Sequence, residues 1–254
     1  MASRALLSIG VFAALFVCDG LQAQVASDAK GQNSVPLIGC KSDGQTGPIE
    51  APESGTISVG ISRAAGQNLA YYKAISGVGV LAPRGWHCFG TYGSGGETLL
   101  VSAEPIDTSS SLLRPQDLSG PAVQLSYIYG DTSGSLTVAE IVARIFPAYR
   151  SRAIDVMNGF DVPESERVFG PYPKDSLTYR SEKVVEFRTP ARTDGLGTRS
   201  FLPKNDNPIC GVVILMGQAP NLLHLSVRLP APVARFASAI VEQLEFDAAH
   251  PPRE

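Results

Sequence analysis

The chain has 254 residues, a formal net charge of -3 at pH 7 and a hydrophobic fraction of 44%. A charge this close to neutral gives no electrostatic reason to expect nucleic acid or an anionic membrane surface as a partner. The length suffices for one large domain with its own core, or for a domain with an extension, and the hydrophobic fraction is that of an ordinary globular protein.

The first 23 residues predict a cleavable secretory signal. Arg4 gives a basic start, the apolar run over residues 5–17 is too short to span a bilayer, and residues 21–23 suit signal peptidase. We therefore expect cleavage before Gln24, a periplasmic or secreted mature protein, and no membrane span after cleavage. An uncleaved anchor and a lipid on Cys18 are the alternatives, although the residues before Cys18 fit a lipobox poorly.

Polar and small residues follow the cleavage point and predict a flexible leader over residues 24–35. Short alternating or apolar runs then predict strands at 56–62, 69–75, 77–82 and 98–102. A stretch rich in Ser, Pro and Asp predicts a connection over residues 107–121.

The second half of the chain mixes helices and strands. Thr137 to Glu140 has the pattern of a capping box before an apolar helical face, and Pro147 should end that helix near Phe146. A further helical stretch to about residue 157 follows, then a loop over 161–173. Later patterns predict strands at 183–189, 211–216 and 223–229, and a last helix over 232–244.

Short links between adjacent strands favour antiparallel pairing, so we expect an α+β fold in which helices pack on an antiparallel sheet. The expected organisation is a signal at 1–23, a leader at 24–35, an N-terminal extension of strands and loops at 36–76, a main domain at 77–247 and a loose tail at 248–254.

From Val78 onward the chain resembles the PsbP-like fold. The resemblance rests on a strand that enters Ala82-Pro83-Arg84-Gly85-Trp86, and on an ending of two strands that lead into the helix at 232–244 and then Phe246. It implies a binding or adaptor domain more than an enzyme, and it carries no family site over to named residues. The whole chain also resembles secreted bacterial proteins, which adds a location but no activity.

Removal of the signal leaves Cys40, Cys88 and Cys210. An oxidising compartment favours one disulfide and leaves one thiol over. Cys40 and Cys88 lie in glycine-punctuated segments, whereas Cys210 opens an apolar run and resembles a buried small hydrophobe. We therefore predict a Cys40–Cys88 disulfide and a buried thiol at Cys210, while the other two pairings remain open.

Arg84, Trp86 and His87, beside Cys88, form the densest cluster of chemically useful side chains. Trp86 could cover a ligand groove, with Arg84 as a fixed positive charge, or it could pack into the core as a corner residue. A thiol nucleophile is disfavoured, because neighbouring residues on a strand point to opposite faces and His87 cannot easily activate Cys88.

An alternative binding face is His224, Ser226 and Arg228, which alternate with apolar residues on one predicted strand. We expect this face to be exposed to solvent, as on a half-buried strand. The strand over 123–129 has the same alternation and gives the same expectation.

No metal or cofactor is expected. The histidines at 87, 224 and 250 have no ligand spacing, and the glycines at 93–96 lack the lysine and helix of a phosphate loop. The leading hypothesis is an exported, non-enzymatic binding or adaptor domain that acts on an envelope protein or cell-wall component. The alternatives are a hydrolase-type envelope enzyme, and an inhibitor or immunity protein that presents the loop from Gly90 to Glu97.

Overall fold

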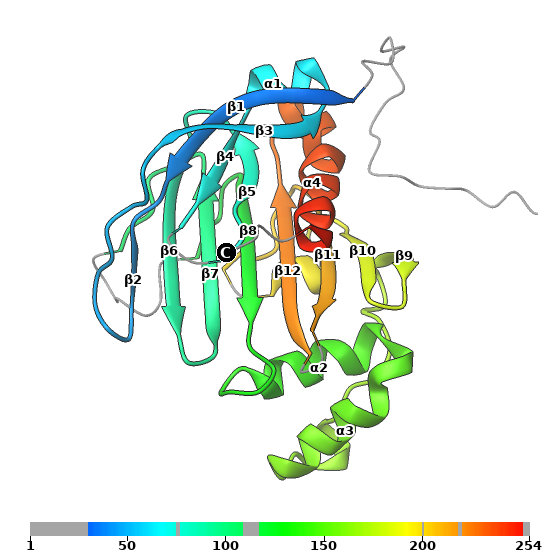
Figure 1. The fold of residues 1–254 in the computed structure, drawn as a ribbon. Helices are drawn as coiled ribbons and strands as arrows, with labels where there is room; N and C mark the ends of the chain where they lie inside the picture. Colours follow the sequence, from blue (N-terminus) through cyan, green and yellow to red (C-terminus); the bar gives the residue numbers. More distant parts are fainter. Residues whose placement is uncertain (1–29, 75–76, 109–116, 200, 218–219, 251–254) are drawn as a thin grey trace, which may run out of the picture.

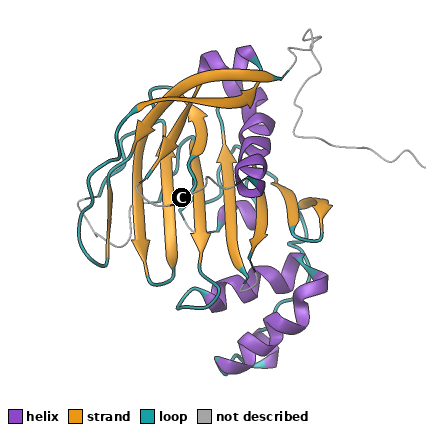
Figure 2. Cartoon of the chain, in the orientation of Figure 1, coloured by secondary structure: helices purple, strands orange, loops and turns teal. Residues whose placement is uncertain are grey.

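The computed structural model describes residues 30–74, 77–108, 117–199, 201–217 and 220–250. These residues form an α+β fold with two β-sheets and four α-helices, as predicted (Figures 1 and 2). The predicted signal at 1–23 lies outside the described residues, as do 24–29 of the predicted leader and 251–254 of the predicted tail. Within the described ranges, no helix is long and apolar enough to cross a membrane.

An eight-stranded sheet forms the centre of the molecule. In spatial order its strands are β2 (Ser42–Gly44), β6 (His87–Gly93), β7 (Gly96–Ser102), β8 (Ala122–Ile128), β12 (Asn221–Arg228), β11 (Ile209–Met216), β10 (Val184–Thr189) and β9 (Ser176–Ser181). Most pairs are antiparallel, as expected, but β2 lies parallel to β6. The apolar strand predicted at 211–216 is β11, which lies between β12 and β10 in the sheet interior.

A second, four-stranded sheet packs on one face of the first. Its order is β3 (Gly55–Ile61), β1 (Gly31–Gly39), β4 (Leu69–Lys73) and β5 (Val80–Pro83), and α1 (Arg63–Asn68) joins β3 to β4. β1 pairs parallel to β4, so the expectation of a purely antiparallel arrangement is wrong for this sheet too. Figure 1 shows β1 and β3 running across the strands of the large sheet.

β1 corrects the prediction of a flexible leader over 24–35. Residues from Gly31 onward pair along β3, and the Val35 side chain is buried in the core shared by both sheets. Alternation in this segment is weak because Pro36 and small polar residues interrupt it, and tertiary contacts decide its conformation. The predicted boundary at residue 76 separates β4 from β5, which are paired neighbours in the small sheet.

Helix α4 (Ala237–Ala249) completes the cover of this first face. Ile240, Val241 and Leu244 join the core between the small and large sheets. The helix was predicted to begin at Pro232, but residues Ala231–Phe236 form a 3-10 turn and the α-helix starts after it. Tyr71 of β4 donates a 2.9 Å hydrogen bond to Asp247, which ties the small sheet to α4.

The carboxyl group of Glu245 makes stability depend on pH where α4 approaches β9 and β10 of the large sheet. Burial and the nearby Glu186 raise the pKa of Glu245 from 4.5 to about 7, although Arg180 opposes the shift. A raised pKa in the folded state means that stability is lost as pH rises from about 4.5 through about 7. Glu245→Gln should flatten that loss and give a higher melting temperature than wild type at pH 8. The exposed Glu164 on a surface turn provides the control Glu164→Gln, which should follow the wild-type profile; a Glu245→Gln profile that also follows wild type would contradict the assignment.

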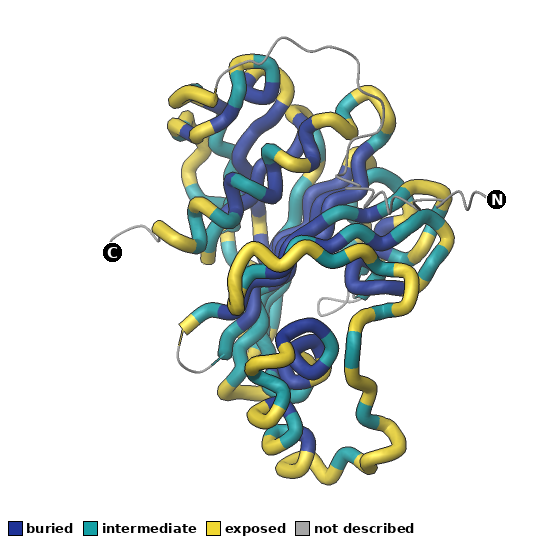
Figure 3. Tube along the Cα trace, turned by 90° about the vertical axis from the view of Figure 1, so that its right-hand side faces the viewer, coloured by how far each residue is buried: buried dark blue, intermediate teal, exposed yellow. Residues whose placement is uncertain are grey.

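The opposite face of the large sheet is covered by α2 (Ser135–Ile145) and the short turn Leu196–Thr198, and α3 (Arg150–Gly159) packs against α2. The apolar side of α2 is buried, as its spacing predicts, and the helix ends at Phe146 before Pro147. The predicted capping box is wrong, because α2 already begins at Ser135 and its N-cap residue is Gly134, which has no side chain to form a capping bond. Figure 3 shows buried residues concentrated along the strands between these layers.

Two covalent or charged links fasten loops to the large sheet. Cys40, just after β1, forms the predicted disulfide with Cys88 of β6, with 5.5 Å between their Cα atoms. Arg228, at the end of β12, is fully buried and donates hydrogen bonds to the carbonyls of Leu118, Gly120 and Pro203. The disulfide therefore joins the short junction between β1 and β2 to β6, and Arg228 holds the connections that contain Leu118, Gly120 and Pro203.

Candidate functional site

A cavity of about 520 Å³ opens on the large sheet, on the face opposite the small sheet. Its floor is formed by β7, β8 and β12, one wall by the start of α2 and by Arg199 and Phe201, and the other by the β6–β7 hairpin. The volume falls within the range of roughly 300–1,000 Å³ that small-molecule sites occupy.

The floor of this cavity is polar where a sheet covered on both faces would ordinarily be apolar. Thr98, Ser126 and His224 lie side by side on adjacent strands, because Thr98 is opposite Ser126 and Ser126 is opposite His224 in the strand register. Gln124 precedes Ser126 by two residues and shares its face. Buried polar groups cost stability unless they are hydrogen-bonded, so this floor needs a compensating network or a ligand.

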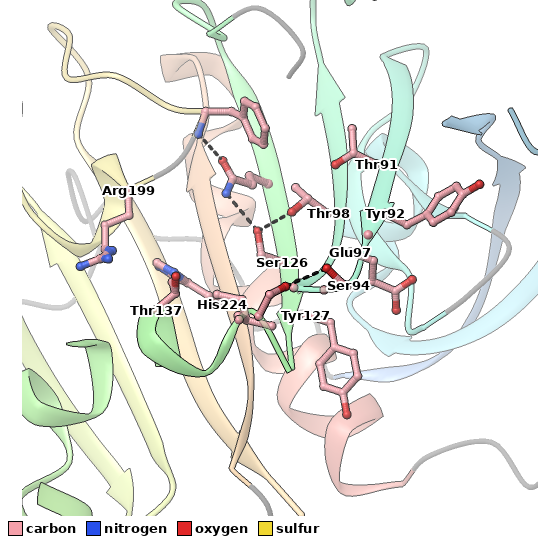
Figure 4. A pocket seen from close by; sticks show the side chains of 18 of the residues that line it. Thr91, Tyr92, Ser94, Glu97, Thr98, Ser126, Tyr127, Thr137, Arg199 and His224 are labelled. Atoms are coloured by element: carbon pink, nitrogen blue, oxygen red, sulfur yellow. Dashed lines mark hydrogen bonds between the residues drawn. The ribbon is translucent and has the colours of Figure 1, made fainter. Parts of the chain in front are cut away.

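A chain of hydrogen bonds satisfies most of the floor (Figure 4). The backbone N–H of Phe201 donates to Gln124 over 3.1 Å, and Gln124 donates to the Ser126 hydroxyl over 3.1 Å. The Thr98 and Ser126 hydroxyls are 3.0 Å apart. Each of these hydroxyls and amides can both donate and accept, so the floor offers hydrogen bonds of either sense to a ligand.

His224 is neutral at physiological pH. Burial, followed by the charge of Arg199, lowers its pKa from 6.5 to about 3, although a hydrogen bond with the backbone of Leu196 opposes the shift. Its ring makes a T-shaped contact with Phe187 of β10 at a centroid distance of 5.5 Å, which restricts the orientation of the imidazole. Its Nε2 atom is 3.5 Å from the Ser226 hydroxyl, at the limit of a hydrogen bond. A neutral imidazole here can donate or accept a hydrogen bond, but it does not carry a charge.

Arg199 forms the charged part of the wall and is held from outside the cavity. Its Nη2 atom lies 2.9 Å from Glu140 of α2, and its Nη1 atom lies 3.4 Å from the Tyr172 hydroxyl. Asp175 fixes the backbone turn before Arg199, because its carboxylate accepts hydrogen bonds from Thr189 and from the backbone N–H of Leu196, each over 2.8 Å. The guanidinium is therefore oriented before any ligand arrives.

The β6–β7 hairpin, which contains the predicted inhibitory loop from Gly90 to Glu97, forms the opposite wall. The hydroxyl of Ser94 at its tip lies 2.8 Å from Ser133 and accepts a bond from Gln45 over 3.2 Å. The backbone N–H of Tyr129 donates to the carbonyl of Gly95 over 3.1 Å. The tip is thus fastened on both sides and bounds the cavity, in place of the protruding free loop that an inhibitor would use.

The first predicted binding cluster lies away from this cavity. Arg84, Trp86 and His87 stand at the start of β6, whereas the cavity lining on this strand begins at Thr91, about 13 Å further along. Arg84 has an exposed side chain whose guanidinium donates to the carbonyls of Gly66 and Leu69 at the end of α1. Trp86 is only partly buried and packs against the inter-sheet core, with its backbone N–H bonded to the Tyr72 hydroxyl over 3.1 Å.

The second predicted cluster is divided by the structure. His224 lines the cavity, Ser226 lies beside it but is 1% exposed, and Arg228 is bound to loop carbonyls at the end of the strand. The expectation that this face is exposed is wrong, because α2 and the segment around residues 196–202 cover it. The same cover buries Gln124 and Ser126, which were expected to face solvent.

Cys210 also differs from its prediction. It is half-buried on β11, and no cysteine in the described part of the chain is a free thiol. Gly211, the next residue on β11, allows neighbouring groups to approach its backbone closely. A Cβ atom there would lie 2.6 Å from the Phe187 ring and 1.9 Å from the Leu225 carbonyl. Only glycine lets Phe187 cross this strand and reach His224.

The polar groups that line the cavity floor are hydrogen-bond donors and acceptors. Ser226, the hydroxyl closest to His224, does not line the cavity, so the pair does not present a nucleophile to a ligand. In the described part of the chain, no group of three His, Cys, Asp or Glu side chains could hold a metal ion. Comparisons with protein-family models, curated proteins and solved structures gave no match. The resemblance to the PsbP-like fold therefore stays a prediction.

Proposed function

We propose that this chain is an exported binding domain that takes a small polar ligand in the cavity on its large sheet. The observation that carries the proposal is the polar floor of Thr98, Gln124, Ser126 and His224 beneath an open cavity of about 520 Å³. These are positions where apolar side chains would pack against a covering layer and stabilise the fold. A stability cost at adjacent positions is the usual sign of a site kept for binding.

Export is supported by two independent features. The first 23 residues have the pattern of a secretory signal, and the described chain contains the Cys40–Cys88 disulfide, which persists in oxidising compartments. The ligand would then come from the envelope or its surroundings. This agrees with the sequence-based expectation of a cell-wall component as partner.

Thr98→Val tests whether the cavity floor binds the ligand. The change removes a hydroxyl and keeps the side-chain shape, so it should weaken binding about tenfold and leave the melting temperature unchanged or slightly raised. A thermal-shift screen of the wild-type protein with sugars, sugar acids, amino acids and short peptides supplies the ligand, and calorimetry measures its affinity.

The matched control is Thr178→Val on the exposed edge strand β9, which should bind as wild type does. If Thr98→Val binds as tightly as this control, the cavity is not the binding site. If no compound in the screen shifts the melting temperature, the small-ligand proposal fails. The adaptor hypothesis would then be favoured, with a protein partner.

A further inference from the structure

The charges around the cavity limit the ligand class more closely than its volume does. Among the described residues that line it, only Arg199 and Glu97 carry a full charge. Glu97 precedes Thr98 on β7, and neighbouring residues on a strand point to opposite faces. Its carboxylate lies beside Gly77, before β5 of the small sheet, where an added Cβ atom would be 2.5 Å from Glu97 Oε1.

Arg199 is therefore the one charged side chain that the described lining presents on the cavity face. Figure 4 shows it on the opposite side of the view from Glu97, with Ser126, Thr98 and His224 between them. Glu140, which neutralises part of its charge, does not line the cavity. Within the described chain, Glu140 and Tyr172 engage two of the five N–H donors of the guanidinium.

We propose that the ligand is a small sugar acid, whose carboxylate binds Arg199 and whose hydroxyls bind the polar floor. This inference rests on the proposed function and specifies its ligand. A carboxylate matches the planar fork of a pre-oriented guanidinium. The hydroxyls and the amide of Thr98, Ser126 and Gln124 match ligand hydroxyls, which also donate and accept. An ammonium group finds no carboxylate on this face of the described lining, so an amino acid fits less well.

The affinities of D-glucuronate and D-glucose for the full mature protein, measured by calorimetry, test the proposal directly. The two probes differ only in the carboxylate. Wild type should bind glucuronate at least about tenfold more tightly than glucose, because a hydrogen bond between two charged groups is strong. Arg199→Gln should abolish that preference by weakening glucuronate binding far more than glucose binding, and Arg199→Lys should keep part of the preference.

Arg180→Gln serves as the control, because Arg180 forms an exposed ion pair with Glu186 on the far edge of the sheet. It should keep the full preference for glucuronate. Melting curves show whether each variant is folded. Glu140→Gln should reduce the preference for glucuronate by a few-fold without abolishing it, because the loss of this carboxylate only loosens the orientation of Arg199.

Each outcome separates the two proposals. Equal wild-type affinities for glucuronate and glucose would overturn the sugar-acid assignment. Binding of both probes would still support the cavity as a binding site. Competition by inorganic phosphate as strong as that of glucuronate would also overturn it, since Arg199 would then recognise any oxyanion. An Arg199→Gln variant that loses glucose and glucuronate binding equally would show a structural role. Failure of both probes to bind at millimolar concentration would contradict the sugar-acid proposal, whereas the proposed function fails only if the wider screen is also negative.

Discussion

Arg228→Ala is expected to lower the free energy of unfolding by about 3–5 kcal/mol, one of the largest losses available to a single change in this chain. The guanidinium is 0% exposed, and burial lowers its pKa from the ordinary arginine value. It donates to the carbonyls of Leu118, Gly120 and Pro203, in two loops that cross the end of the sheet. Alanine would leave these carbonyls without a donor in the interior and would open a cavity beside them.

Urea denaturation of the purified protein measures this loss. Arg192→Ala is the control, because its ion pair with Asp206 is fully exposed to solvent and contributes little to stability. Arg228→Lys keeps the charge but cannot reach three carbonyls with a planar fork, so its stability should fall between wild type and alanine. Equal stability of the Arg228→Ala and Arg192→Ala variants would show that the loops are held by other contacts.

The double change Cys40→Ser and Cys88→Ser is expected to destabilise the protein by about 4 kcal/mol. The bond closes a loop with a sequence separation of 48 residues, and the loop-closure entropy of the unfolded chain sets this magnitude. The double variant is required because either single variant leaves a thiol that can exchange. Guanidinium denaturation under non-reducing conditions provides the measurement.

A matched control is Ser54→Ala, which removes an exposed hydroxyl contact to Gly39 in the same segment and should change stability by less than about 1 kcal/mol. If the double cysteine variant unfolds at the wild-type denaturant concentration, the four-stranded sheet alone holds the N-terminal segment. Peptide mapping of the wild type without reduction should recover the Cys40–Cys88 pair.

Local patterns predicted the class of the fold and most of its elements. Alternation over residues 56–62 became β3, the apolar run at 211–216 became β11, and Pro147 ended α2 where its ring forbids a helix. The local patterns missed α1, β1, β2, β6 and β9, and two of these elements show the physical reason. β9 has only Leu177 and Tyr179 as apolar residues and is a largely exposed edge strand, whereas β1 forms only through pairing with β3 and β4.

The candidate site was harder to predict from the sequence, because the same alternation of polar and apolar residues occurs on a solvent-exposed strand and on a strand beneath a cavity. Gln124, Ser126 and His224 alternate with apolar residues, and such alternation ordinarily indicates a face in water. The difference arises from α2 and the segment that carries Arg199, which cover this face without filling it. The position of that cover depends on contacts between residues far apart in the chain, such as Arg228 with Leu118, which no local pattern encodes.

The two parallel pairings have a consequence for the order in which the protein can assemble. β1 needs β4, with Leu37 opposite Tyr71, and β2 needs β6, with Ser42 opposite Gly90. A parallel pair cannot close through a tight hairpin, so both pairings wait for residues synthesised much later. Cys40 lies between β1 and β2, so its pairing with Cys88 also waits for residues that are synthesised later. An oxidant that acts before residue 88 is available would therefore meet this cysteine without its partner, which makes the earliest part of the described chain the most exposed to mispairing during biogenesis.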